Sequence, residues 1–246
     1  MKQPSVLIQG WISWQMRLAG LPRHYQHHPP AIGQIDFGEL RQIQPLRRDT
    51  DGASGQAIDR YYIEQFLRRE AHVLKGRVLT IGYDPYDSVF AESNLAITSL
   101  AFTDDTELID RLADVKDNTY DVLLLVQVLH SIYDLHAAVR HLHRILAPEG
   151  ILLATVPGTC YAAGAINQIK PYWGFTNFSL RKLIETVFPP RRINIENFGN
   201  ALVTMVHLHR LGFAELTQKE LNLRDKHFPL LLTLKAQKAS AYRSNN

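Results

Sequence analysis

Polar residues follow the apolar runs that predict buried strands. His130 comes shortly after the uninterrupted run Val122–Val126, and Asp104 and Asp105 follow the weaker run "NLAITSLAF". In a doubly wound sheet, a ligand binds beyond the carboxyl ends of the strands, where the strand order reverses. We therefore expect a ligand site at this edge. A hydrogen-bonded loop histidine without any other role explains His130 equally well.

The turn "GYDPYD" follows another predicted strand and contains one glycine, Gly82, with Asp84 two residues later. A residue without a side chain lets the backbone approach a ligand closely, but an ordinary strand-to-helix turn accounts for a lone glycine equally well. The dinucleotide pattern G-x-G-x-x-G and the phosphate-binding pattern G-x-x-x-x-G-K-[ST] are both absent from the sequence. NAD and nucleoside triphosphates are therefore poor candidates.

Aromatic residues gather close to the same edge. Tyr133 lies near His130 in the sequence, and Tyr172, Trp173 and Phe175 occur in the loop "KPYWGFTNFS". These rings are candidates for the walls of a pocket, and core packing is the alternative interpretation.

Metal binding and nucleophilic catalysis find little support in the sequence. His141/His143 and His207/His209 are two residues apart on predicted helices and so point to different faces. The sequence has no G-x-S-x-G, and Cys160 has no recognisable catalytic partner. We expect no metal.

Alternating strands and helices predict an α/β fold. A helix is expected over "DRYYIEQFLRREAHVL" with Asp59 as its cap, and a strand over Arg77–Ile81. Between Ser93 and Asp117 the runs are too short to assign. Strand "YDVLLLV", helix "DLHAAVRHLHRILAPEG" with Asp134 as cap, and strand "GILLATVPG" then form a βαβ unit, which builds parallel sheets.

The C-terminal part supplies further elements. Ser179 is expected to cap a helix over "SLRKLIETVF", "NALVTMVHLHRLGF" is helical, and "HFPLLLTLKAQK" gives a last strand. We expect an irregular lead-in over residues 1–55, one domain over 56–240 and a disordered tail over 241–246.

Composition limits the partners. The 246 residues are 46% hydrophobic and 21% charged, and the net charge of +3 is spread along the chain without a basic patch. We therefore expect no nucleic-acid partner. The single cysteine favours a reducing compartment such as the cytoplasm. No stretch approaches the roughly 20 apolar residues that span a bilayer, so we expect no membrane partner.

Several of these segments together resemble a known family. "DRYYIEQFL", "GRVLTIG", "YDVLLLVQVLHSIYDLHAAVRHLHRILAPEGILLATVPG", "YWGFTNFSLRKLIETVF" and "FGNALVTMVHLH" are similar to class I S-adenosylmethionine (SAM)-dependent methyltransferases, closest to the type 11 branch often found with sugar-modifying enzymes. The resemblance implies a doubly wound, mostly parallel, seven-stranded Rossmann-like sheet with an antiparallel last strand. It covers residues 37–238.

The resemblance also implies a cofactor and a site. Gly82, with Asp84 in its turn, would lie beneath the methionine part of SAM, and Asp104 would accept from the ribose hydroxyls. Gln127, Val128, Leu129 and His130 would flank the sulfonium, and Tyr62, with Tyr61 beside it, would close the pocket. His130 is the hypothetical general base, because imidazole titrates near neutral pH. Tyr133, Tyr172 and Trp173 would bind the acceptor, a small molecule or a glycan-type molecule, and an association with sugar-modifying enzymes is a further hypothesis.

The chain departs from the family pattern at the cofactor turn. Thr80 stands where an acidic residue is common, Tyr83 is bulky, and Pro85 has no N–H to donate. The interval from Gly82 to Asp121 is short for two strands and two crossover helices. The leading hypothesis is an active methyltransferase. The alternative is a catalytically inactive relative that keeps the fold as a binding or scaffolding module.

Overall fold

The computed structural model describes residues 37–47, 57–82, 96–102, 105–159 and 170–240 of the chain. The chain divides into two units, Met1–Ile43 and Gln44–Asn246. In the described part of the first unit, a short 3-10 turn spans Gly38–Leu40, and the Arg41 guanidinium lies 5.4 Å from the centre of the Phe37 ring. All elements below belong to the second unit.

The second unit is built around one six-stranded sheet in the order β2-β1-β3-β4-β6-β5. Strands β1 to β4 are parallel to one another, whereas β6 runs antiparallel to both β4 and β5. The strands span Arg77–Gly82 (β1), Ala96–Ala101 (β2), Tyr120–Val126 (β3), Leu146–Pro157 (β4), Ile193–Phe198 (β5) and Leu231–Gln237 (β6). This is the expected mostly parallel α/β sheet with an antiparallel last strand.

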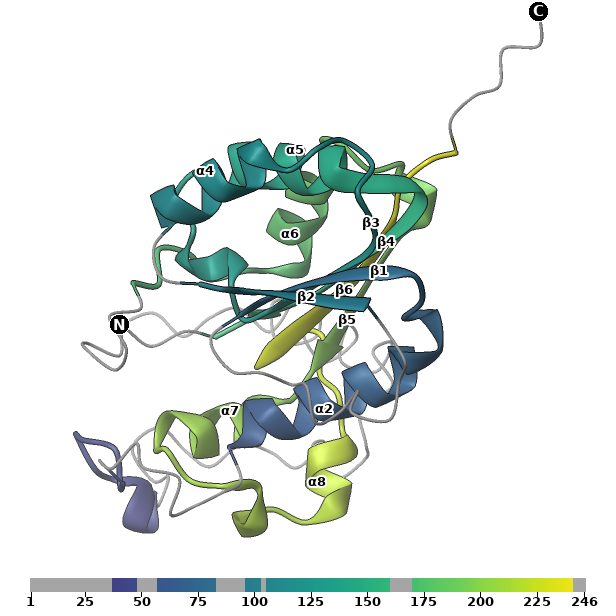
Figure 1. Ribbon diagram of the computed structural model, residues 1–246. Helices are drawn as coiled ribbons and strands as arrows, with labels where there is room; N and C mark the ends of the chain where they lie inside the picture. The colour runs from purple at the N-terminus through teal and green to yellow at the C-terminus, as the bar shows by residue number, and fades with distance from the viewer. Residues whose placement is uncertain (1–36, 48–56, 83–95, 103–104, 160–169, 241–246) are drawn as a thin grey trace, which may run out of the picture. The chain divides into compact units, whose positions relative to one another are not determined.

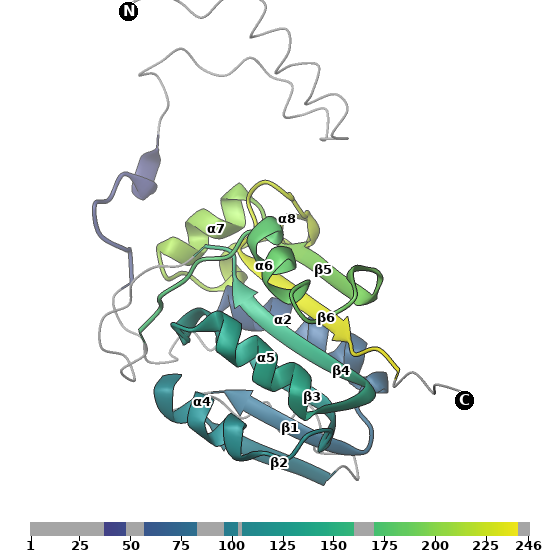
Figure 2. The same cartoon turned by 90° about the horizontal axis from the view of Figure 1, so that it is seen from above.

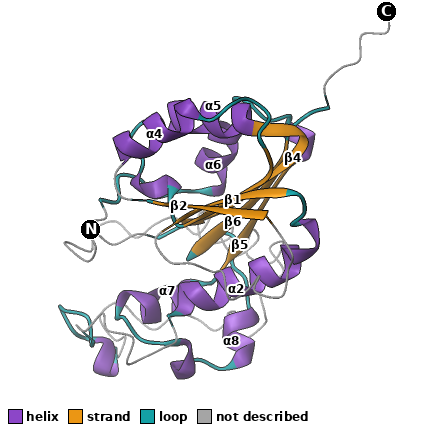
Figure 3. Cartoon of the chain, viewed as in Figure 1, coloured by secondary structure: helices purple, strands orange, loops and turns teal. Residues whose placement is uncertain are grey.

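Helices cover both faces of the sheet (Figures 1 and 2). On one face lie α4, α5 and α6, and on the other α2, α7 and α8, as the colouring by secondary structure also shows (Figure 3). The helices span Ile58–Glu70 (α2), Asp105–Asp114 (α4), Leu135–Ile145 (α5), Asn177–Ile184 (α6), Ala201–Leu208 (α7) and Gln218–Asn222 (α8). The layers match the doubly wound arrangement that the sequence predicts.

The central strand β3 explains why both layers are needed. Its side chains alternate between the two apolar cores: Leu123 and Leu125 pack with α4, α5 and α6, whereas Leu124 and Val126 pack with α2 and α7. All four are at most 7% exposed. An uninterrupted apolar run is what a strand covered on both faces requires.

The predicted βαβ unit is confirmed as β3–α5–β4. The Asp134 carboxylate caps α5 by accepting from the Ala137 N–H at 2.8 Å. The helix ends at Ile145, and the segment through Pro148 and Glu149 already belongs to β4. There the register with β3 shifts, and Glu149 has φ of 63°, so residues 146–150 form an irregular start of the strand.

The expected strand count is wrong by one: the described residues form six strands instead of seven. The segment from Gly82 to Tyr120 contains β2 and α4, which resolves the ambiguous runs "NLAITSLAF" and "ELIDRLADV" as a strand and a helix. Among the described residues of the interval that looked short for two strands, one strand is present. As a result, β2 is the terminal strand on its side of the sheet.

Two expected helix caps are also wrong. Helix α6 is capped by Thr176, whose Oγ1 accepts from the Ser179 N–H at 3.1 Å while Ser179 Oγ accepts from the Thr176 N–H at 2.9 Å. Ser179 is thus the third residue of a capping box rather than the cap itself. Helix α2 begins at Ile58, so Asp59 lies in its first turn, where a carboxylate still suits the helix dipole.

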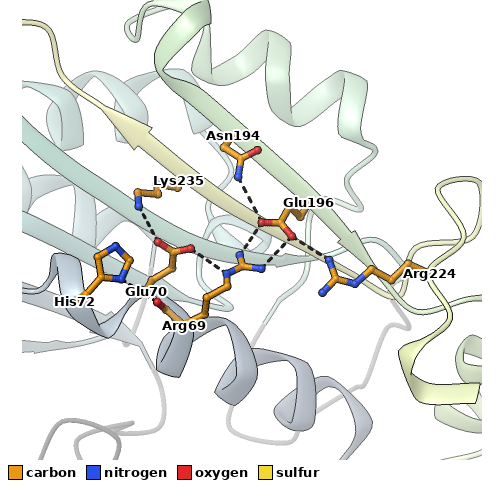
Figure 4. A network of polar contacts seen from close by, with 7 residues as sticks. All are labelled: Arg69, Glu70, His72, Asn194, Glu196, Arg224 and Lys235. Carbon is orange, nitrogen blue, oxygen red and sulfur yellow. Dashed lines mark hydrogen bonds and ion pairs between the residues drawn. The ribbon is translucent and has the colours of Figure 1, made fainter. Parts of the chain in front are cut away.

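A network of charged residues fastens α2 to the strands β5 and β6 (Figure 4). Arg69 makes two hydrogen bonds to the Glu196 carboxylate, at 3.0 and 2.6 Å, and Arg224 donates to the same carboxylate at 2.9 Å. Beside it, buried Glu70 accepts from Lys235 at 2.8 Å and from Arg69 at 3.1 Å. These bonds fix the helix across the antiparallel end of the sheet, away from the ligand edge of the parallel strands.

Candidate functional site

The strand order reverses between β1 and β3. From β1 the chain continues to β2 on one side, and from β3 it continues to β4 on the other. Gly82 and Val126, the last residues of β1 and β3, are register partners, so the turn that begins at Gln127 leaves the sheet beside Gly82. Ligands of open α/β sheets bind at such a switch point. The structure thus places Gly82 and Gln127 together, as the sequence predicts.

Gln127 has an unusual backbone conformation. Its φ is 53°, in the left-handed region that non-glycine residues adopt infrequently. Its N–H donates to two acceptors on Thr155 of β4, the carbonyl oxygen at 3.1 Å and the side-chain Oγ1 at 3.2 Å. Such conformations persist where the surroundings fix them, and they cluster at functional sites.

The next residues form a tight, buried turn. Val128 and Leu129 are 0% exposed and pack in the core beneath α4 and α5, and a 3-10 turn spans Leu129–Ser131. Their side chains anchor the turn, so any contact of theirs with a cofactor would use backbone atoms. Their predicted part in cofactor binding stays a prediction.

His130 combines burial with an unsatisfied nitrogen. Its Nδ1 is buried and has no hydrogen-bond partner among the described residues, and the same holds for the neighbouring Ser131 Oγ. Burial lowers the pKa of His130 from its usual 6.5 to about 4, because desolvation disfavours the charged imidazolium. The imidazole is therefore neutral at pH 7 and keeps a lone pair that can accept a proton.

The aromatic loop is bonded directly to this turn. The backbone N–H groups of Tyr172 and Trp173 both donate to the carbonyl of His130, at 2.8 and 3.1 Å. The Trp173 indole N–H donates to the carbonyl of Ile132 at 2.9 Å. The loop and the turn are thus one locally cross-linked structure, although 42 residues separate His130 from Tyr172 in the sequence.

A pocket of about 670 Å³ opens beside this structure. The Tyr133 ring lies 5.5 Å from that of Tyr172 and 6.2 Å from that of Trp173, and Tyr133 is 66% exposed. The pocket is lined by residues of the α5 start, the aromatic loop and α6: Tyr133, Asp134, Leu135, His136, Trp173, Gly174, Phe175, Ser179, Lys182 and Leu183. Of the three aromatic residues proposed for the acceptor, Tyr133 and Trp173 line it directly, and Tyr172 contacts the Tyr133 ring.

Tyr62 lies in the core instead of at this edge. It is 2% exposed, its hydroxyl donates to the carbonyl of Leu221 at 2.8 Å, and its ring lies 5.5 Å from that of Phe198. Burial also raises its pKa above the usual range, so the phenol stays neutral. A contact between Tyr62 and a cofactor would require the ring to leave this position.

Two of the predicted residues, Asp84 and Asp104, lie outside the described residues. Tyr83, Tyr86 and Phe90 also lie outside the described residues. An open cofactor cleft would support an active enzyme, and a cleft filled by these three side chains would support the inactive alternative. Thr80, which replaces the usual acid, is described: its hydroxyl donates to Ser99 Oγ on β2 at 3.1 Å.

The sequence reasoning missed Thr155. It lies in "GILLATVPG" and is 1% exposed, and its hydroxyl is the second acceptor for Gln127. A polar residue within an apolar strand run was the available signal. Among the described residues, no three His, Cys, Asp or Glu side chains gather as metal ligands. The described helices are all too short or too polar to cross a bilayer.

The doubly wound sheet with its turn at the switch point defines a Rossmann-like fold of the nucleotide-cofactor type. The family model described as "Methyltransferase domain" matches residues 61–194, more than half of the chain. The chain therefore belongs to the methyltransferase-domain family and is an enzyme.

Two solved structures illustrate the likeness. A SAM-dependent methyltransferase of Archaeoglobus fulgidus is 15% identical, with 73% of this chain and 94% of that chain covered and a TM-score of 0.43. The 1,6-didemethyltoxoflavin-N1-methyltransferase of Burkholderia thailandensis is 16% identical, with 77% and 82% covered and a TM-score of 0.47. No curated protein matches the chain. The family of the chain is therefore established by the match to the family model.

The described residues fit SAM at the switch point. Gly82 ends β1 beside the last residue of β3, Gln127 turns its backbone at the end of β3, and the buried Nδ1 of His130 lacks a protein partner among the described residues. An unpaired buried nitrogen is costly unless a ligand or water satisfies it. This unsatisfied nitrogen, beside an aromatic pocket, is the feature that most needs a functional explanation.

Proposed function

We propose that this chain transfers a methyl group from SAM to an oxygen or nitrogen of a small-molecule or glycan-type acceptor, held in the pocket that Tyr133 and Trp173 line. The observation that carries the proposal is the Nδ1 of His130, which is buried and has no hydrogen-bond partner among the described residues. The backbone carbonyl of the same residue accepts hydrogen bonds from the aromatic loop that lines the pocket. In this proposal the cofactor edge and the acceptor pocket would be linked through His130.

The chain's own residues would do three things. Gly82 and Gln127 would position the cofactor at the switch point, with Asp84 and Asp104 as further proposed contacts. Bound SAM supplies an electrophilic methyl group on a cationic sulfur. Much of the catalysis is then orientation, and one base suffices to take the proton of the attacking hydroxyl or amine. His130 is the proposed base, because its imidazole is neutral at pH 7 and its Nδ1 has no hydrogen-bond partner among the described residues.

The pocket supports the acceptor class. Trp173 is held by its indole hydrogen bond and is 39% exposed, so it offers a fixed apolar face. Tyr133 stands beside it, and the polar groups of Asp134, Ser179 and Lys182 are spread along the rim. Flat aromatic faces with polar groups around them suit a ring that has apolar C–H faces and hydroxyl edges, as sugars have. An association with sugar-modifying enzymes and a cytoplasmic location belong to the same proposal.

A transfer assay tests the proposal. The protein is incubated with methyl-labelled SAM and separate pools of oligosaccharides, sugar nucleotides, phenols and amines, and the label in each pool is counted. We expect transfer to a saccharide pool, its loss in His130→Ala and Trp173→Ala, and its retention in His72→Gln. His72 is a suitable control because it is exposed at the end of α2, where its Nδ1 contacts the Arg69 carbonyl. Transfer that is unchanged in His130→Ala would remove this residue as the base.

One observation favours the inactive alternative. The Thr80 hydroxyl, at the position where an acid is common, is engaged with Ser99 within the sheet and offers no carboxylate. A relative that has lost cofactor binding would show no label transfer and no affinity for SAM. The fold would then serve as a binding or scaffolding module.

A further inference from the structure

Thr155 is a buried residue whose hydroxyl contacts the start of the proposed cofactor turn. Thr155 is 1% exposed and lies on β4, in register with Val126 of β3. At this depth its side chain is excluded from contact with a ligand at the edge of the sheet. Any effect of Thr155 on the site must therefore act through the residues that it touches.

The residue it touches is Gln127. In a parallel ladder the Gln127 N–H already has a regular acceptor, the Thr155 carbonyl at 3.1 Å. The Thr155 hydroxyl adds a second acceptor at 3.2 Å for the same N–H. Valine would fill the same volume in an apolar strand, so packing does not explain the hydroxyl. The extra acceptor lies at the point where the backbone leaves the strand with a positive φ.

The positive φ determines the course of the following residues. A non-glycine residue in this conformation is held there by its surroundings, and without them it relaxes to a more common backbone angle. Such a relaxation would rotate the next peptide units, which form the turn that carries His130. That turn is also fixed at its middle, where the His130 carbonyl accepts from Tyr172 and Trp173.

We propose that Thr155 is a positioning residue: its hydroxyl, with its carbonyl, holds Gln127 in the left-handed conformation and so presets the turn for SAM. The inference rests on the proposed function, because it assumes that the turn binds the cofactor. Thr233 offers a matched control. It is the β6 register partner of Thr155 and is equally buried, at 1% exposed, but it lies on the side of β4 away from β3.

The test is the affinity for SAM of four purified proteins, measured by calorimetric titration: wild type, Thr155→Val, Thr155→Ser and Thr233→Val. Loss of one hydrogen bond worth about 1 kcal/mol corresponds to about five-fold in affinity. We expect Thr155→Val to bind about five-fold more weakly, Thr155→Ser to bind like wild type because it keeps the hydroxyl, and Thr233→Val to bind like wild type. Urea unfolding of each variant separates loss of affinity from loss of stability.

The other outcomes are distinct. Equal affinity of Thr155→Val and wild type would overturn the inference, as would a Thr155→Ser variant as weak as Thr155→Val, or equal weakening by Thr233→Val. If Thr155→Val does not fold, Thr155→Ala replaces it, since alanine also lacks the hydroxyl. If wild type itself does not bind SAM, the proposed function fails first, and the inference fails with it.

Discussion

The indole N–H of Trp173 donates to the carbonyl of Ile132 at 2.9 Å, so a ring that lines the pocket is fixed to the turn that follows the central strand. Sites built on such locked side chains lose little entropy when a ligand binds. The bond also links the pocket to the turn, so we expect a substitution of Trp173 to alter the structure of both.

Trp173→Phe tests that connection. Phenylalanine keeps an aromatic face but has no N–H, so the Ile132 carbonyl loses its donor. We expect the free energy of unfolding to fall by about 1 to 2 kcal/mol, measured by urea denaturation. Phe178→Ala is the control: Phe178 is 84% exposed on α6, and its replacement should change stability by less than about 0.5 kcal/mol. Equal losses in the two variants would show that the indole bond contributes nothing.

His130 should make stability depend on pH. Its pKa is about 4 in the folded protein and near 6.5 when unfolded, so between these values the unfolded chain binds more protons. The contribution of neutral His130 to the free energy of unfolding is complete above pH 6.5 and is lost as the pH falls toward 4. At pH 5 the loss is at most about 2 kcal/mol. We expect His130→Gln to lose less stability than wild type between pH 7.5 and 5. Parallel curves for the two proteins would contradict the lowered pKa. His141, His143 and His207 are common to both and cancel in the comparison.

The same lowered pKa predicts the pH profile of transfer. If neutral His130 is the base, kcat/KM should stay flat from pH 8 down to about 5 and fall only as the pH approaches about 4. A fall centred near pH 6.5 would indicate either a histidine with an ordinary pKa or another base.

Tyr62→Phe separates a core role from a cofactor role. The substitution removes the hydroxyl that donates to Leu221 and leaves that carbonyl without its donor, which should cost about 1 kcal/mol of unfolding free energy. Affinity for SAM should be unchanged, because the ring is buried against Phe198 of β5 and its hydroxyl bonds to Leu221 of α8. Weaker SAM binding at unchanged stability would restore Tyr62 as a cofactor contact.

The network in Figure 4 gives a prediction far from the site. Burial tends to raise the pKa of Glu196, but hydrogen bonds from Arg69 and Arg224 outweigh it and lower the pKa. Because the folded pKa is lowered, this stabilisation is present above the unfolded pKa and is lost as the pH falls through the folded one. We expect Glu196→Gln to cost about 1 kcal/mol at pH 7 and low salt, and less at high salt or pH 3.

Glu64→Gln is the matched control for the network. Glu64 lies on the same helix but pairs only along it, with Arg60 and Arg68 four residues away on either side. Such pairs are worth about 0.3 to 0.5 kcal/mol. A cost for Glu64→Gln equal to that of Glu196→Gln would show that the network does not fasten α2 to the sheet.

The sequence predicted those elements whose local and tertiary signals agree. The run Val122–Val126 predicts a strand covered on both faces, and Asp134 before an apolar stripe predicts a helix start; both are confirmed. At α6 the pattern does not decide between Thr176 and Ser179, which are three residues apart and both suit a cap, and backbone geometry selects Thr176. At α2 the N-cap is Ala57, which makes no side-chain cap hydrogen bond, so no residue type marks the start of that helix.

For the candidate site, the sequence predicts which residues lie at the strand ends but not how their side chains and backbone are held. Strand ends locate Gly82, Gln127 and His130, since the topology brings carboxyl ends to one edge. The burial of His130, the conformation of Gln127 and the hydroxyl of Thr155 depend on contacts between segments 28 or more residues apart, which no local pattern encodes. The same holds for the six strands of the described residues, because a short interval between Gly82 and Asp121 does not tell which element is absent from them.

Calorimetric titration of the purified wild-type chain with SAM, and in parallel with its demethylated product, tests cofactor binding most directly. We predict saturable binding of both at micromolar affinity, one molecule per chain. The absence of heat and of saturation in a sample shown to be folded by circular dichroism and cooperative unfolding would contradict the assignment of the switch-point turn to SAM.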